Sequence, residues 1–101
     1  MMLPHVIRFN GEEFGNYYFE LLECTAGGNG FPAPATGYEG LADFVADLVQ
    51  QAGLISRLRE LEIPTGSLEA LASDAAKQWT AEFNPRKVGA EQFLSLYQAA
   101  Y

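Results

Sequence analysis

The residues from Ser67 to Phe83 constrain the fold most, because their apolar side chains recur at the spacing of one helix face. The stripe comprises Leu68, Leu71, Ala72, Ala75, Ala76, Trp79 and Phe83. This pattern predicts one amphipathic helix over 67–83, which ends at Asn84-Pro85 because proline cannot donate a backbone hydrogen bond. We expect this central helix to be covered by helices at 41–52 and 90–100, which would make the C-terminal half self-sufficient.

Five further stretches show the same periodicity, and nowhere does the sequence alternate as a half-buried strand would. The predicted helices are 2–10, 12–24, 38–53, a short one within 54–63, and 90–101, with Gly89 at the N-cap of the last. Within 12–24, the apolar stripe is predicted to pack in the core and consists of Phe14, Tyr17, Tyr18, Leu21 and Leu22. The prediction is an all-α single domain over residues 1–101, with five to six helices and a long Gly/Pro-rich loop at about 25–37.

Composition excludes several classes of function. The 101 residues include 13 acidic and 6 basic side chains, which give a formal charge of −7. Nucleic acids and anionic membranes attract clustered Lys and Arg, so neither is an expected partner. No stretch reaches the roughly 20 apolar residues of a membrane span, and the N-terminus lacks a signal-peptide pattern. Cys24 has no second cysteine to pair with, which fits a reducing cytoplasm.

Few residues are candidates for chemistry. His5 and Cys24 are the only histidine and cysteine, and a transition-metal site usually needs three or four ligands. Asp43 and Asp47 lie one helical turn apart and could hold a cation, although a solvated polar face explains them better. Arg86 could bind an anion or pair with a nearby acid. We therefore predict no catalytic, cofactor-binding or metal-binding residue in this chain.

The loop contains one pattern that resembles a dinucleotide fingerprint. Residues Gly28 to Ala33 match GxGxxA. That motif requires a preceding strand and a following helix, whose N-terminus faces the pyrophosphate. Here a helix precedes, and Pro32 and Pro34 prevent an immediate long helix, so we reject the nucleotide-binding interpretation. The loop itself remains open to three interpretations: functional, mobile, or packed by its own side chains.

Three segments, taken in order, resemble the end of the iron-containing (group III) alcohol dehydrogenase family. The first is 3–10, with the letters LPHVIRFN. The second is 57–64, RLRELEIP, which leads into LEALA at 68–72. The third is 84–88, NPRKV, and the chain then closes on AAY at 99–101. The resemblance runs over essentially the whole chain but covers only the closing part of a family member.

The resemblance implies a fold and an enzyme context. The fold would be the C-terminal end of the helical domain of dehydroquinate synthase-like and iron alcohol dehydrogenase proteins. Full-length relatives bind NAD(P) in an N-terminal Rossmann-like domain and carry Fe²⁺ or Zn²⁺ in the helical domain. Their metal ligands and nucleotide-binding glycines lie upstream of the LPHV segment, and His5 matches a position that is not a ligand. This chain departs from the family in its Gly/Pro-rich residues 25–37 and in Gly89, where a hydroxyl N-cap is usual.

Two functions follow as expectations. One is the C-terminal portion of such an oxidoreductase, inactive alone because it lacks the nucleotide and metal motifs. The other is a small acidic helical module that binds a protein or a small ligand. Loss of the upstream helices would expose apolar surface, so we expect either a homo-oligomer, most simply a two-fold dimer, or a missing N-terminal Rossmann part as partner. The expected interface is 3–9 together with Phe14, Tyr17 and Leu21.

Overall fold

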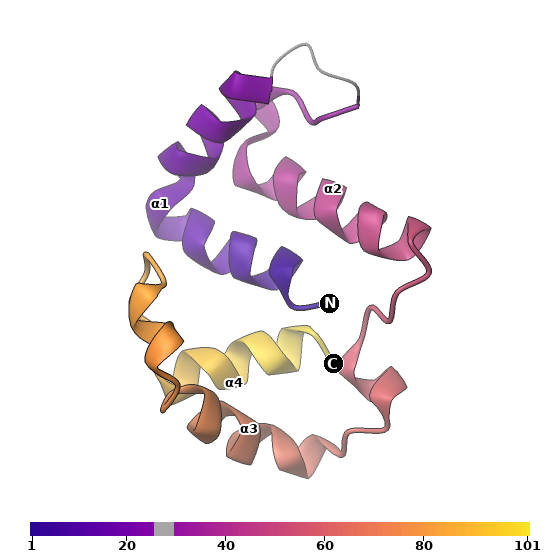
Figure 1. The fold of residues 1–101 in the computed structure, drawn as a ribbon, viewed down its shortest axis with the longest axis vertical. Coiled ribbons are helices and arrows are strands. Elements are labelled where there is room, and N and C mark those ends of the chain that lie inside the picture. The colour runs from indigo at the N-terminus through magenta and orange to yellow at the C-terminus, as the bar shows by residue number, and fades with distance from the viewer. Residues whose placement is uncertain (26–29) are drawn as a thin grey trace.

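The computed structural model describes residues 1–25 and 30–101, and within these ranges every regular element is helical (Figure 1). The elements in order are α1 (Leu3–Thr25), the 3₁₀-helix η1 (Pro34–Thr36), α2 (Gly37–Gln51), η2 (Leu58–Leu61), η3 (Thr65–Ser67), α3 (Leu68–Ala75), η4 (Trp79–Phe83) and α4 (Ala90–Ala99). The all-α prediction is confirmed. Four described α-helices replace the predicted five to six, because the helices predicted at 2–10 and 12–24 merge into α1 and the one predicted within 54–63 forms only a 3₁₀ turn.

The helices lie side by side in a flat layer, with the first half of α1 and α4 in the middle and α2 and α3 on the outside (Figure 1). α1 packs along α2, α3 packs along α4, and a smaller contact between α1 and α4 joins the pairs. The molecule measures 44 × 30 × 18 Å, and its radius of gyration is 14.7 Å. A compact domain of this length would have a radius of gyration of about 13 Å. The helices therefore spread sideways and do not stack along the short axis.

Helix α1 joins the two helices that were predicted at 2–10 and 12–24. It does not break at Gly11 but bends three residues later, where Phe14 has non-helical angles of φ −119° and ψ 31°. Gly11 is buried, and a Cβ atom there would lie 2.1 Å from Cγ of Tyr38. Because Gly11 has no side chain, α1 and α2 can approach each other closely at this point. The helix continues through Gly11.

The first core lies between α1 and α2. Ile7, Leu22, Leu41 and Ala42 are buried, and partly buried rings such as Tyr18 pack against them. The apolar stripe predicted for 12–24 is only partly right. Leu22 is 1% exposed, but Tyr17 is 56% and Leu21 is 51% exposed, so one edge of the stripe faces outward.

The second core lies between α3, α4 and η2. Leu58, Leu68 and Ala100 are buried together, and the backbone N–H of Leu58 donates to the carbonyl of Ala100 at 2.9 Å. The last helix begins as predicted with Gly89 at its N-cap, whose N–H donates to Oε1 of Gln92 at 3.0 Å. This bond satisfies one of the backbone donors that every helix start leaves free.

The predicted central helix over 67–83 is wrong in its second half. α3 ends at Ala75, Gln78 is extended with ψ 127°, and the chain then forms the 3₁₀-helix η4. Short helices depend on tertiary packing, and α4 covers α3 but leaves the outer residues of η4 uncovered. Trp79 and Phe83 consequently are 70% and 74% exposed. The expected cover by 41–52 is also wrong, because α2 packs along α1.

The remaining boundaries follow turn chemistry. α2 closes with Gly53 at φ 65°, the left-handed conformation that glycine adopts without penalty, as predicted. The helix predicted within 54–63 is reduced to η2. Gly28 and Asn29 of the rejected GxGxxA pattern lie outside the described residues. Among the helices that are described, none combines the length and the apolar character needed to cross a membrane.

Candidate functional site

A polar junction ties α1 to the connector between η4 and α4. Nδ2 of Asn10 donates to Oδ1 of Asn84 at 2.9 Å, and Nδ2 of Asn84 donates back to Oδ1 of Asn10 at 2.8 Å. Asn84 also donates to the backbone carbonyl of Arg86 at 2.6 Å. Asn10 is 3% exposed, so its amide would be costly to bury without these partners.

Arg86 completes the junction, and its partners all come from α1. Its Nη1 donates to the carbonyl of Phe9 and, at 2.7 Å, to Oε2 of Glu12. Its Nε lies 3.5 Å from Oε2 of Glu13. Its guanidinium carbon lies 4.0 Å from the centre of the Phe9 ring. Of the two roles considered from sequence, Arg86 therefore takes the pairing role, because its donors already face a carbonyl and two carboxylates.

An apolar pocket of about 280 Å³ adjoins this junction. It lies between α1, the end of α3, η4 and α4, and its lining includes Val6, Phe9, Ala75, Ala81, Val88 and Phe93. Among the described residues that line it, none is Asp, Glu, His, Cys, Lys or Arg. General acid–base chemistry needs a titratable group within hydrogen-bond reach of the reacting atom. The pocket suits an apolar group and carries no such residue in its wall.

His5 borders a second cavity, of about 310 Å³, together with Arg8, Ser56, Arg57 and Tyr101. Partial burial is the main cause that lowers the pKa of His5, and the positive charges of Arg8 and the N-terminal amine lower it further. Arg8 is itself paired with Glu39 at 3.1 Å and with Asp43. The positive charges that lower the pKa of His5 also disfavour the binding of a further positive ion beside it.

The other candidates from the sequence do not come together. Cys24 is a free, exposed thiol on α1. Asp43 pairs with Arg8 across the α1–α2 contact, whereas Asp47 is exposed one turn further along α2. In residues 1–25 and 30–101, no three His, Cys, Asp or Glu side chains are grouped as a metal site requires.

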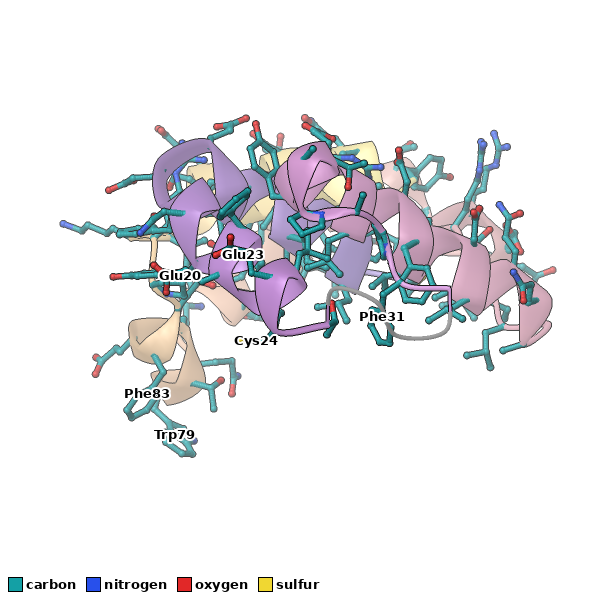
Figure 2. The ribbon with its side chains drawn as sticks, turned by 90° about the horizontal axis from the view of Figure 1, so that it is seen from above. Glu20, Glu23, Cys24, Phe31, Trp79 and Phe83 are labelled. Atoms are coloured by element: carbon teal, nitrogen blue, oxygen red, sulfur yellow. The ribbon has the colours of Figure 1, made fainter. Side chains whose placement is uncertain are left out.

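The most exposed aromatic side chains were missed by the sequence reasoning, which placed them in a covered stripe. Trp79 and Phe83 stack edge to face, with ring centres 5.5 Å apart and planes at 90°. Figure 2 shows both rings projecting from η4 away from the body of the molecule, on the side where Phe31 and Cys24 also lie. We call this pair, Trp79 and Phe83, the aromatic spur. Only its helical spacing was visible in the sequence, and that spacing does not distinguish a buried ring from an exposed one.

Comparison with known proteins places the chain. Residues 1–101 match the family described as Fe-containing alcohol dehydrogenase family, C-terminal. The crystal structure of 1,3-propanediol oxidoreductase has a similar fold, with a TM-score of 0.82 and 22% sequence identity. The match covers 99% of this chain and 26% of that chain. No curated protein matches the sequence. The family match spans every residue, and the chain therefore belongs to the iron-containing alcohol dehydrogenase family, in its C-terminal part.

Proposed function

We propose that this chain is the helical C-terminal portion of an alcohol-oxidising enzyme of its family and has no activity alone. The observation that carries the proposal is the family match over residues 1–101, combined with coverage of only 26% of the similar oxidoreductase. The remaining length in such a relative offers room for a nucleotide-binding domain and for the metal ligands. Those parts would act either in one polypeptide with this chain or as a separate subunit.

The metal of the family does not fit the residues described here. A catalytic Zn²⁺ typically takes three protein ligands and leaves one open position, and non-haem Fe²⁺ sites likewise use histidine and carboxylate ligands. The described part of the chain groups no three such side chains. His5 lines a cavity together with Arg8 and Arg57, and the positive charge of Arg8 near His5 disfavours a bound cation there. We therefore derive no metal-dependent step from these residues.

The described residues of the loop also do not fit a dinucleotide-binding site. The segment that precedes the GxGxxA pattern is the helix α1, whereas a dinucleotide fingerprint follows a strand. The role left for this chain is to complete the helical domain and to hold its shape. The apolar pocket beside η4 would then contribute a hydrophobic wall to whatever the assembled enzyme binds.

An assay of the isolated chain tests the proposal. The purified chain is loaded with Fe²⁺ or Zn²⁺, dialysed, and analysed for retained metal. It is then supplied with NAD⁺ or NADP⁺ and 1,3-propanediol, the substrate named for the similar oxidoreductase. We expect no stoichiometric metal and no reduced nucleotide, while a full-length family member treated in parallel shows both. Either tight metal binding or turnover by the isolated chain would refute the proposal.

A second candidate function is a small acidic helical module that binds a protein or a small molecule. The aromatic spur favours it, because exposed Trp side chains are typical of interaction surfaces. The genomic sequence upstream of Met1 separates the two functions. A reading frame that encodes a Rossmann-like domain and the upstream metal ligands would support the enzyme, and an unrelated neighbouring gene would support the module.

A further inference from the structure

The cavity beside His5 is lined by groups that donate hydrogen bonds. It lies where the start of α1, the end of α2, the linker that follows α2 and the end of the chain come together (Figure 1). Its polar lining consists of His5, Arg8, Gln50, Ser56, Arg57 and Tyr101. Among the described residues that line it, none is Asp or Glu, although the chain has 13 acidic and only 6 basic side chains. We call this space the His5 cavity.

Arg8 keeps hydrogen-bond donors for a further partner. Its Nε pairs with Oε2 of Glu39 at 3.1 Å, and its Nη2 pairs with Oδ1 of Asp43. A guanidinium carries five N–H donors on three nitrogens, so these two pairs do not exhaust it. The Glu39 and Asp43 side chains are 57% and 72% exposed, and water therefore screens their charge. Arg8 can thus accommodate a third acceptor without giving up either pair.

Arg57 brings a second guanidinium to the His5 cavity. Within residues 1–25 and 30–101, Arg57 takes part in no ion pair, so its charge is not compensated locally. The backbone beside it is fixed, because the N–H of Leu58 donates to the carbonyl of Ala100. The acid Glu60 accepts a hydrogen bond from Ser56 at 3.2 Å. Two arginines from separate elements thus border one space.

The charge around His5 has the sign that attracts an anion. Partial burial is the main cause that lowers the pKa of His5, and the charges that lower it further, those of Arg8 and of the N-terminal amine, are both positive. The cavity volume is about 310 Å³, roughly ten times the ~30 Å³ that one water occupies in the liquid. It therefore has room for a small anion together with water.

We propose that the His5 cavity binds a phosphate group between the guanidinium groups of Arg8 and Arg57. Arginine pairs with phosphate through two parallel hydrogen bonds. A phosphate presents oxygens on several sides and can accept from two arginines on different elements, whereas a carboxylate has only two oxygens. Inorganic phosphate and a phosphate monoester share this chemistry, and the experiment distinguishes them. This inference does not rest on the oxidoreductase assignment.

Proton NMR of His5 tests the proposal on the intact chain. His5 is the only histidine, so its ring resonance reports on this cavity. Its pH titration is recorded in inorganic phosphate and in acetate at equal ionic strength. Because a bound anion favours the cationic imidazole, we expect a higher titration midpoint in phosphate and a shift that saturates. Phenyl phosphate in a third series shows which source is preferred: tighter saturation than inorganic phosphate indicates an ester, and weaker saturation indicates the free ion.

Two substitutions in the same linker region provide a matched pair. Arg57→Gln removes a guanidinium from the cavity, and Arg59→Gln removes an equal charge from an exposed residue that does not line it. A hydrogen bond to a charged group contributes enough that its loss should weaken phosphate binding about tenfold or more in Arg57→Gln. Arg59→Gln should bind as the original chain does. Arg8→Lys keeps the charge but not the fork of donors, and it should also bind more weakly.

Urea unfolding gives a second measurement that does not depend on the His5 resonance. A ligand that binds only the folded chain raises its stability. Phosphate also stabilises proteins in general by exclusion from their surface, and that effect is common to all variants. Phosphate should therefore raise the urea midpoint of the original chain and of Arg59→Gln more than that of Arg57→Gln.

Three results would overturn the proposal. The first is a His5 titration that does not respond to phosphate up to tens of millimolar. The second is an equal response to acetate, which would indicate screening by any anion. The third is equal phosphate binding by Arg57→Gln and Arg59→Gln. Circular dichroism of each variant establishes that it is folded before its binding is measured.

Discussion

Replacing Arg86 with alanine tests whether the polar junction stabilises the chain. Its side chain is 26% exposed, so its interactions are only partly screened by solvent. A hydrogen bond to a charged group contributes about 1.5 to 3 kcal/mol, and a cation–π contact at a wet site contributes about 0.5 to 1 kcal/mol. The Glu12 and Glu13 side chains are mostly exposed, and such ion pairs contribute only about 0.2 to 1 kcal/mol each.

These interactions share one guanidinium and are not additive, so we expect Arg86→Ala to lower the free energy of unfolding by about 2 to 3 kcal/mol. A domain of this size has a total stability of about 5 to 15 kcal/mol. Urea unfolding followed by circular dichroism measures the change. Small proteins have slopes of about 1 to 3 kcal/mol per M, and the midpoint should fall by about 1 M or more. Protein concentration is held fixed throughout, because dimerisation would add to the apparent stability.

Two further variants separate the geometry of Arg86 from its charge. Arg86→Lys keeps the charge, but a single ammonium cannot reach a carbonyl and a carboxylate while covering a ring, so it should recover less than half of the loss. Lys77→Ala removes an equal charge from an ion pair with Asp74 whose side chains are 70% and 74% exposed, and should change stability by less than about 0.5 kcal/mol. If Arg86→Ala were no more damaging than Lys77→Ala, the junction would not be a stabilising element.

Three other predictions concern the core, the α1–α2 contact and pH. Leu22→Ala, at a side chain that is 1% exposed, should lower the unfolding free energy by about 2 to 5 kcal/mol in urea, and a loss below 1 kcal/mol would contradict its burial. Gly11→Ala places a methyl group against the Tyr38 ring and should cost about 1 to 3 kcal/mol or more, whereas Gly66→Ala meets no atom within 4 Å and should be nearly neutral in the same assay. The pKa of His5 is lowered in the folded state, so the unfolded chain takes up its proton first. Urea midpoints should therefore fall as pH is lowered from 7.5 to 5.5, and they should fall less in His5→Gln; equal slopes would refute the assignment.

The sequence predicted correctly those helices that have a regular apolar face and a specific capping or turn residue at one end. α2 has an apolar residue at nearly every inward position and a glycine after its last turn, and both features act within the segment itself. α4 likewise begins where Gly89 and Gln92 meet. The family resemblance rested on short segments of packing and turn residues, and the match over residues 1–101 confirms it.

The junction could not be predicted because its partners are remote in sequence. Asn10 and Asn84 are separated by 74 positions, and Arg86 and Phe9 by 77. No periodicity identifies such a pair, since each residue alone is compatible with a solvated loop or helix face. Gly11 is a similar case, because its role depends on the Tyr38 ring of another helix. The sequence pattern predicted a helix break at Gly11, but in the structure α1 continues and Gly11 allows close contact with the Tyr38 ring.

The junction also explains why the predicted central helix stops early. Asn84 and Arg86 hold the connector against α1, so the chain must leave the axis of α3 before it reaches Asn84. A 3₁₀ turn rises about 2.0 Å per residue, against 1.5 Å for an α-helix, and η4 thus spans the same gap in fewer residues. The change of helix type also alters which residues face inward: Ala81 then lines the pocket, while Trp79 and Phe83 face outward. The 3₁₀-helix η4 therefore leads directly into the junction residue Asn84, whose hydrogen bonds to Asn10 anchor the end of η4 to α1.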